Sequence, residues 1–249
     1  MNILLTIAVT FFAGMGAGLG TGFAGMSAAA VISPMLITFL KMDPYMAIGI
    51  ALSSDVLASA VSAYIYGKNK NLDIKNGIIM MISVLTFTVV GSYIASLLPA
   101  ATMGSFSVFM TFLLGIKFIV RPVMTTKEAM QGVSAKKRAI QSVVCGIMIG
   151  LICGFVGAGG GMMMLLILTS VLGYELKTAV GTSVFIMAFT AFTGAVSHFM
   201  IVGAPDWTVF ILCVVFTLIW ARIAARFANK ARFCERHACE TFGTVARLG

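Results

Sequence analysis

Two glycine-rich stretches hold the residues of this chain that are best suited to chemistry. They occupy positions 18–25 and 150–161, and each separates two apolar runs. Glycine lets the backbone leave helical dihedral angles, and a helix that resumes after such a break points free N–H groups and a partial positive charge outward. We predict that the breaks bind an anion, the alternative being close helix packing through small residues. The predicted substrate-binding residues here are Gly22, Phe23, Gly25, Gly154, Phe155, Gly157, Gly159 and Gly160.

Four hydroxyl side chains lie at matching places further along the chain. Ser53 and Ser54 follow the first stretch, and Thr182 and Ser183 follow the second. Their hydroxyl groups can donate hydrogen bonds to anionic oxygens, so we add them to the predicted substrate-binding residues. The alternative is a hydrogen bond back to the i−4 carbonyl of their own helix.

Two titratable residues are candidates for proton coupling. Asp55 lies inside an apolar run, where an ionised carboxylate is costly unless it faces a cavity, pairs or takes a proton. His198, near the end of another run, has an unperturbed pKa of about 6.5 that suits proton exchange. The alternatives are a carboxylate hydrogen-bonded to neighbouring helices and a structural histidine.

The composition shows which elements must position these residues. Of the 249 residues, 60% are hydrophobic and 10% are charged, against about 25% charged in an average soluble domain. This excludes a soluble globule, a disordered chain, a disulfide scaffold and a nucleic-acid-binding domain. Long apolar runs predict an all-α, polytopic integral membrane protein with 8–9 transmembrane segments. The runs are 3–21, 26–40, 45–66, 77–97, 104–120, 139–156, 160–172, 178–201 and 207–221.

The two halves of the chain resemble each other at an offset of 132 residues. Gly22, Phe23 and Gly25 match Gly154, Phe155 and Gly157, and an Ala-x-Gly pattern follows in both halves at the same separation. We therefore predict a duplication with a first membrane repeat at 1–120, a basic linker at 121–138 and a second repeat at 139–249. Asp55 has no acidic counterpart, because the offset leads to Met187.

Basic residues indicate how the repeats are oriented. They cluster at 67–75, at 121–138 and from 222 onward. If every run crosses the membrane, all three clusters lie on one face, the cytoplasmic one by the positive-inside rule. The second half then enters from the opposite side, which makes an inverted-topology repeat with short, glycine-broken helices. Tyr66 and Trp207 end apolar runs and are predicted to be interfacial anchors.

Several motifs in order resemble a known family. They are Gly154-Phe-Val-Gly-Ala-Gly-Gly-Gly161, Ala179-Val-Gly-Thr-Ser183, His198 and Ala204-Pro-Asp-Trp207, with degenerate forms in the first half. Together they resemble the TauE/SafE family of sulfite-exporter-like permeases, over residues 1 to about 230. The resemblance implies a bacterial-type inner-membrane transporter of sulfite, sulfonates or related organosulfur anions. Family members usually end in another hydrophobic helix, whereas this chain turns polar and basic from about 228, so we expect that final helix to be missing or altered.

The function that we predict is secondary transport of a small anion, with possible proton coupling. The alternative is a non-transporting membrane assembly or structural protein. We expect no enzyme activity, because no metalloprotease-like pattern or nucleophile–base pair is present, and no cofactor. Cys234 and Cys239 flank His237, but no second ligand pair lies nearby, so we expect no metal site either. The expected partners are the lipid bilayer and a small anionic solute, with a second copy of the chain as a further candidate, and not nucleic acid.

Overall fold

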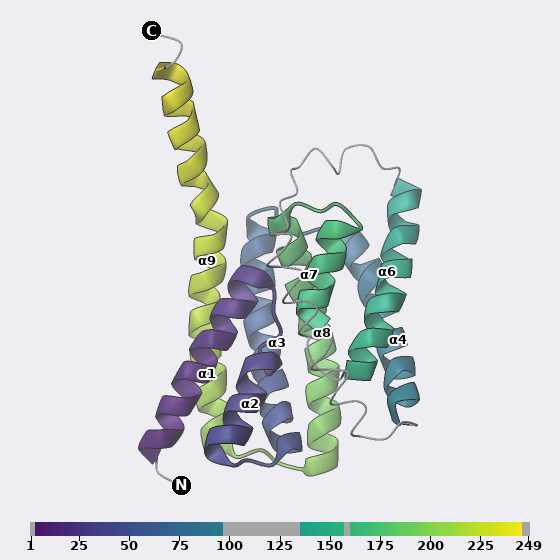
Figure 1. Cartoon of the computed structure of the whole chain (residues 1–249), viewed down its shortest axis with the longest axis vertical. Coiled ribbons are helices and arrows are strands. Elements are labelled where there is room, and N and C mark those ends of the chain that lie inside the picture. Colours follow the sequence, from purple (N-terminus) through teal and green to yellow (C-terminus); the bar gives the residue numbers. More distant parts are fainter. Residues whose placement is uncertain (1–2, 97–134, 157–159, 246–249) are drawn as a thin grey trace.

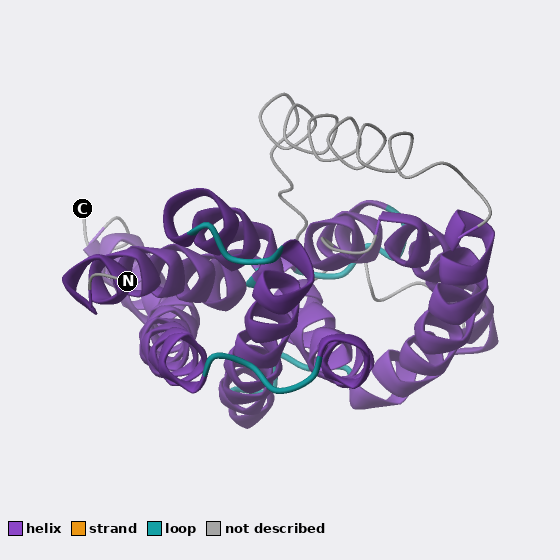
Figure 2. Cartoon of the chain, turned by 90° about the horizontal axis from the view of Figure 1, so that it is seen from below, coloured by secondary structure: helices purple, strands orange, loops and turns teal. Residues whose placement is uncertain are grey.

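The described part of the molecule is a bundle of helices (Figures 1 and 2). The structure is a computed structural model that describes residues 3–96, 135–156 and 160–245. Within these ranges the secondary structure is helical and contains no strand, so the all-helical prediction is confirmed. The helices are α1 (Ile3–Ala24), α2 (Ala29–Leu40), α3 (Pro44–Lys68), α4 (Ile74–Ser96), α6 (Ala135–Val156), α7 (Gly160–Ser170), α8 (Leu176–Val202) and α9 (Trp207–Val245).

Eight of the nine predicted apolar runs correspond to these helices, and the run at 104–120 lies outside the described residues. Among the described helices, four are long and apolar enough to cross a membrane: Ile3–Ala24, Met46–Lys68, Leu176–Val196 and Trp207–Lys230. The helices α2 and α7 have only 12 and 11 residues. A bilayer needs about 20 helical residues, so neither short helix spans it alone. The prediction of 8–9 spans stays a prediction.

Aspartates mark the starts of three helices. The carboxylate of Asp43 accepts a hydrogen bond from the Met46 N–H (3.2 Å) at the start of α3. Asp73 likewise accepts from the Asn76 N–H (3.1 Å) at α4, and Asp206 from two backbone N–H groups at α9. An N-cap side chain satisfies N–H groups that have no partner within the helix. The aspartates at 73 and 206, which correspond in the two halves with a one-residue shift from the offset of 132, therefore both cap the helix that follows them.

The helices α1 and α9 pack closely through glycine. A Cβ added at Gly18 would lie 2.6 Å from the Thr217 carbonyl oxygen, and one added at Gly22 would lie 2.5 Å from the Ala224 Cβ. The sequence predicted a turn from Gly18 onward, but α1 stays helical to Ala24. Most of the first glycine stretch is thus a packing surface of the kind common between membrane helices, which corrects the predicted boundary.

The two predicted interfacial anchors differ in their surroundings. Trp207 is 61% exposed at the start of α9. Tyr66 is buried, and its hydroxyl group donates a hydrogen bond to the Gly22 carbonyl (2.9 Å). The prediction for Tyr66 was wrong, because the side of α3 that carries Tyr66 packs against α1 and α8, although the opposite side of the same helix end is exposed.

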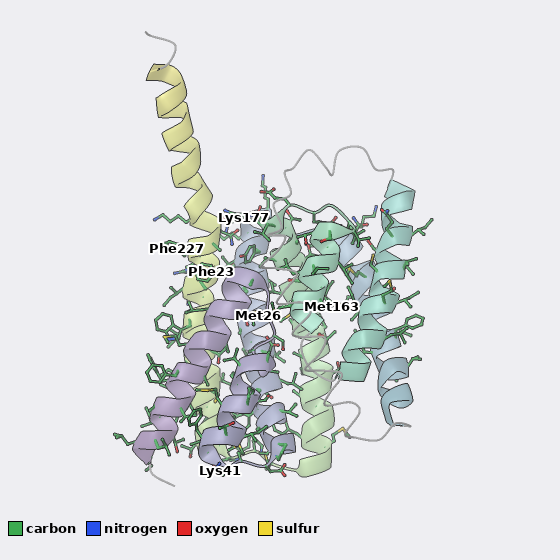
Figure 3. The ribbon with its side chains drawn as sticks, viewed as in Figure 1. Phe23, Met26, Lys41, Met163, Lys177 and Phe227 are labelled. Carbon is green, nitrogen blue, oxygen red and sulfur yellow. The ribbon has the colours of Figure 1, made fainter. Side chains whose placement is uncertain are left out.

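The two glycine-broken helix pairs open toward opposite ends of the bundle (Figure 1). The helix α1 starts at the N-terminal end and α2 returns to that end, where Lys41 lies (Figure 3). The helix α6 starts at the other end and α7 runs back to it. The α3–α4 loop, the start of α6 and the C-terminal part of α9 share this second end, so the described basic segments lie together.

Candidate functional site

The first glycine break is a turn in which several backbone groups are hydrogen-bonded. Gly25 has a φ of +61°, in the left-handed region that favours glycine. Its N–H donates to the Thr21 carbonyl (3.0 Å), and the Met26 N–H donates to the Gly20 carbonyl (3.2 Å). The Thr21 hydroxyl group donates to the Met26 carbonyl (2.8 Å). Together with the hydrogen bond from the Tyr66 hydroxyl group to the Gly22 carbonyl, these bonds let a helix end inside a bilayer without exposing these backbone groups to lipid.

The two glycine breaks meet in space. Gly161, the second residue of α7, faces the turn so closely that an added Cβ would contact the Gly25 carbonyl oxygen and lie 3.0 Å from the Ser27 nitrogen. Figure 3 shows Met26, beside the first break, and Met163, in α7, near the middle of the bundle. The absence of a side chain at Gly161 is what allows the contact. Two stretches from different halves of the chain therefore share one junction, which we call the glycine junction (Gly25–Ser27 with Gly160–Gly161).

The predicted hydroxyl residues of α8 lie on two sides of this region. Ser183 is buried against Gly25, and its hydroxyl group donates to the Val180 carbonyl (2.9 Å). Thr182 is also buried, and its oxygen accepts a hydrogen bond from the Asp73 N–H (3.3 Å) in the α3–α4 loop. Ser183 therefore belongs to the glycine junction, and Thr182 joins α8 to the loop at the basic end.

The hydroxyl residues of α3 bond within their own helix. Ser53 donates to the Gly49 carbonyl (2.9 Å) and Ser54 to the Ile50 carbonyl (3.0 Å). This is the alternative that the sequence left open. Either hydroxyl group would have to give up this bond before it could donate one to a solute.

Asp55 contacts the junction through Ser27, and it is 1% exposed. Its carboxylate accepts hydrogen bonds from Ser27 Oγ (2.6 Å) and Ser59 Oγ (2.9 Å), and from the backbone of Ala28. Ser27 and Ala28 directly precede α2. The carboxylate thus occupies the N-terminal end of α2, where the helix dipole favours negative charge.

The start of α7 has a different neighbour. The side chain that an added Cβ at Gly161 would meet is the thioether of Met187, where the first half has the carboxylate of Asp55. In addition, no lysine or arginine whose burial the structure describes is buried. One helix start at the junction is therefore occupied by a carboxyl group of the chain, whereas the side chain beside Gly161 is a neutral thioether.

The other predicted residues lie apart from the junction or outside the part of the chain that the structure describes. Gly22 packs on α9, and Phe23 is 45% exposed, with its ring 6.1 Å from that of Phe227. The structure does not bring these two to the junction, because they lie on the side of α1 that faces α9 (Figure 3). Of the remaining residues, Gly157 and Gly159 lie outside the described residues, as do the side-chain surroundings of Gly154, Phe155, His198, Cys234, His237 and Cys239.

Sequence reasoning missed three residues of this region. Ser27 and Ser59 bond to Asp55, and Gly161 makes the contact between the breaks. A signal for Ser59 was available, because it lies one helical turn after Asp55 and so on the same helix face. Ser27 had a signal as the polar residue just before a helix start, a usual capping position.

Comparison with known proteins fits a membrane transporter. The family described as "Sulfite exporter TauE/SafE" matches residues 10–234, nearly the whole chain. The chain belongs to the TauE/SafE family. It is therefore a membrane transporter by family, as the sequence motifs predicted.

Two relatives of this TauE/SafE protein come from Bacillus subtilis (strain 168). It is 27% identical to the "Probable membrane transporter protein YunE" over 203 residues, which cover 76% of this chain and 74% of the relative. It is 24% identical to the "Probable membrane transporter protein YdhB" over 216 residues, which cover 85% of this chain and 86% of the relative. No solved structure gives a significant match.

Proposed function

We propose that this protein is a secondary transporter of a small anion, of the sulfite, sulfonate or organosulfur class, and that the anion binds at the glycine junction. The observation that carries the proposal is the contact between the two glycine breaks at Gly25 and Gly161. The description of the family supports the substrate class. The names of both relatives support transport.

The physics of the junction favours recognition by backbone dipoles. An anion taken out of water needs replacement hydrogen bonds, and among the lysines and arginines whose burial is described none is buried to provide them. The start of α7 has free N–H groups by helix geometry, and its neighbour Met187 carries no charge. At α2 the equivalent place is held by Asp55. The start of α7 is thus the better place for a solute anion.

Proton coupling is part of the proposal. Asp55 lies beside the junction and can exchange a proton, which would change the charge that a bound anion experiences. His198, within α8, is the second candidate. Co-transport of a proton would lower the cost of moving a negative charge through the bilayer.

The proposed setting is the bacterial inner membrane, with the basic end in the cytoplasm and the two halves as inverted repeats. Three arrangements support this: the basic segments share one end, the short helices α2 and α7 follow the two breaks, and the two helix pairs open to opposite ends. Broken helices at matching places in two halves are typical of secondary transporters.

The experiment that tests the function is a flux assay in proteoliposomes with sulfite, an alkyl sulfonate, sulfate and an uncharged solute. We expect flux of at least one sulfur oxyanion above protein-free vesicles. We expect Ser183→Ala to raise the KM for that anion about two- to tenfold, because the Ser183 hydroxyl group would turn its hydrogen from the Val180 carbonyl to the bound anion. The variant adds no volume beside Gly25, so the fold should be retained.

The matched control is Thr193→Ala on the same helix, whose exposed hydroxyl group bonds to the Phe189 carbonyl (3.3 Å). It should leave the KM unchanged. No flux of any sulfur oxyanion by folded protein would refute transport of this class. Equal KM values for the two variants would refute the site.

A further inference from the structure

A lateral groove lies between α3 and α8, separate from the glycine junction. Its volume is about 660 Å³, within the range of small-molecule and lipid sites. Its walls come from the second half of α3, the α3–α4 loop and the middle of α8. They consist of Ala60, Ala63, Tyr64, Gly67, Lys68, Leu72, Phe185, Ala188 and Phe189.

The groove faces outward from the bundle. Tyr64 is 71% exposed and Phe189 is 45% exposed, although both lie within stretches apolar enough to span a membrane. Ala60, Tyr64 and Lys68 are spaced four residues apart, so they share one face of α3. An exposed face within a membrane-spanning stretch contacts lipid. The groove is therefore accessible from the bilayer.

Charge is confined to one end of the groove. Lys68 is the charged residue of its lining, and the exposed Lys70 and Lys75 follow in the loop and in α4. The nearby carboxylate of Asp73 is already engaged by the Tyr174 hydroxyl group (2.9 Å) and the Asn76 amide (2.7 Å). The lysines thus form a positive end beside an apolar channel.

We propose that this groove binds one anionic glycerophospholipid, with an acyl chain along Tyr64 and Phe189 and the phosphate group at Lys68. Basic sites between membrane helices bind anionic lipid headgroups, and a lysine can keep its ammonium group at headgroup level while its stem lies on apolar surface. A second copy of the chain fits less well, because a two-fold contact through the groove would bring two lysine clusters to the same end.

The experiment is native mass spectrometry of the purified full-length protein with phosphatidylglycerol or phosphatidylethanolamine of identical acyl chains. We expect one tightly retained phosphatidylglycerol and weaker retention of phosphatidylethanolamine. We expect Lys68→Ala to weaken phosphatidylglycerol binding about fivefold, the factor for one lysine near a membrane surface. The control Lys41→Ala, at the opposite end of the bundle (Figure 3), should change nothing.

A second variant tests the apolar part of the groove without changing charge. Ala60→Trp fills the space from an exposed position, so the fold should be retained, and it should weaken the binding of both lipids. Equal retention of the two lipids by the wild type would overturn the proposal, as would equal effects of the two lysine variants. A dimer that Ala60→Trp dissociates would also overturn it and assign the groove to a second copy.

Discussion

At the scale of single residues, the two sides of the glycine junction differ by one side chain. Asp55 accepts two hydrogen bonds from the start of α2 and a third from Ser59 of its own helix, and Met187 lies beside the start of α7. The carboxylate has a local role, because it caps the turn through Ser27 and Ala28. Proton coupling would be a second role of the same group. A variant of Asp55 can separate the two roles, because only proton coupling changes how flux depends on pH.

We predict that Asp55→Asn flattens the dependence of anion flux on pH. Asparagine keeps the size of the side chain but cannot gain or lose a proton, so a proton carried by Asp55 would no longer accompany the anion. One of the two carboxylate oxygens becomes an NH₂ group, which costs an accepted hydrogen bond and about 1–3 kcal/mol of stability. Flux into vesicles between about pH 5 and 8, with thermal unfolding measured in parallel, checks both effects.

Asp206→Asn is the matched control, because Asp206 also caps a helix but is exposed at the start of α9. Its pH profile should follow that of the wild type. If Asp55→Asn lowers flux by the same factor at every pH, Asp55 has a structural role alone.

At the scale of helices, the first glycine stretch (18–25) both ends α1 and packs α1 against α9, and the sequence alone could not separate these two roles. Glycine is suited equally to a break and to a close contact, and only the position of the partner helix decides between them. Gly25 ends α1, whereas Gly18 and Gly22 hold α1 against α9. The partner on α9 lies about 200 residues away along the chain, so no local pattern indicates it.

We predict that Gly18→Ala destabilises the protein by about 1–3 kcal/mol, since its Cβ would lie 2.6 Å from a backbone oxygen of α9 that cannot move far. Gly20→Ala, on the same helix, places its Cβ 3.5 Å from the Met26 side chain, an ordinary contact. It should be neutral or stabilise by up to ~1 kcal/mol through helix propensity. Unfolding in detergent micelles measures both, and equal stability of the two variants would contradict the packing of α1 on α9.

Helix positions were predictable where a strong local signal exists. Apolar runs at 26–40 and 45–66 became helices at 29–40 and 44–68, because aspartate and proline mark the boundary between them. The end of α9 was not predicted. It continues past the apolar run ending at 221 to Val245, since neither proline nor glycine interrupts it before Gly243. Burial of Tyr66 was also missed, because the end of a run does not reveal which helices surround it.

At the scale of the whole molecule, the two glycine-broken helix pairs open toward opposite ends of the bundle, and each end carries different segments of the chain. The start of α1 and Lys41 lie at one end, and the α3–α4 loop and the end of α9 at the other (Figures 1 and 3). The repeated motif in the sequence predicted that the two breaks lie at corresponding positions of the two halves. It did not predict their direct contact, because an offset between two motifs carries no information about distance.

We predict that a membrane-impermeant maleimide labels Lys70→Cys and Cys239 from the cytoplasmic side and Lys41→Cys from the opposite side. Each is tested as the single cysteine of the chain, with the other native cysteines replaced by serine. Intact cells and inverted vesicles report the two sides. Labelling of Lys70→Cys and Cys239 from opposite sides would refute the inverted repeat, and labelling of Lys41→Cys and Lys70→Cys from one side would refute the orientation.

The start of α2 lies beside Asp55 and the start of α7 beside Met187, and this difference has a consequence for the number of anions moved per transport cycle. Two symmetric breaks would offer two equivalent positions for negative ions, and their mutual repulsion would have to be overcome in every cycle. Here Asp55 fills one of the two positions with a carboxyl group of the chain itself, which can gain or lose a proton but is never released. Under the proposed mechanism the carrier therefore moves a single anion per conformational cycle.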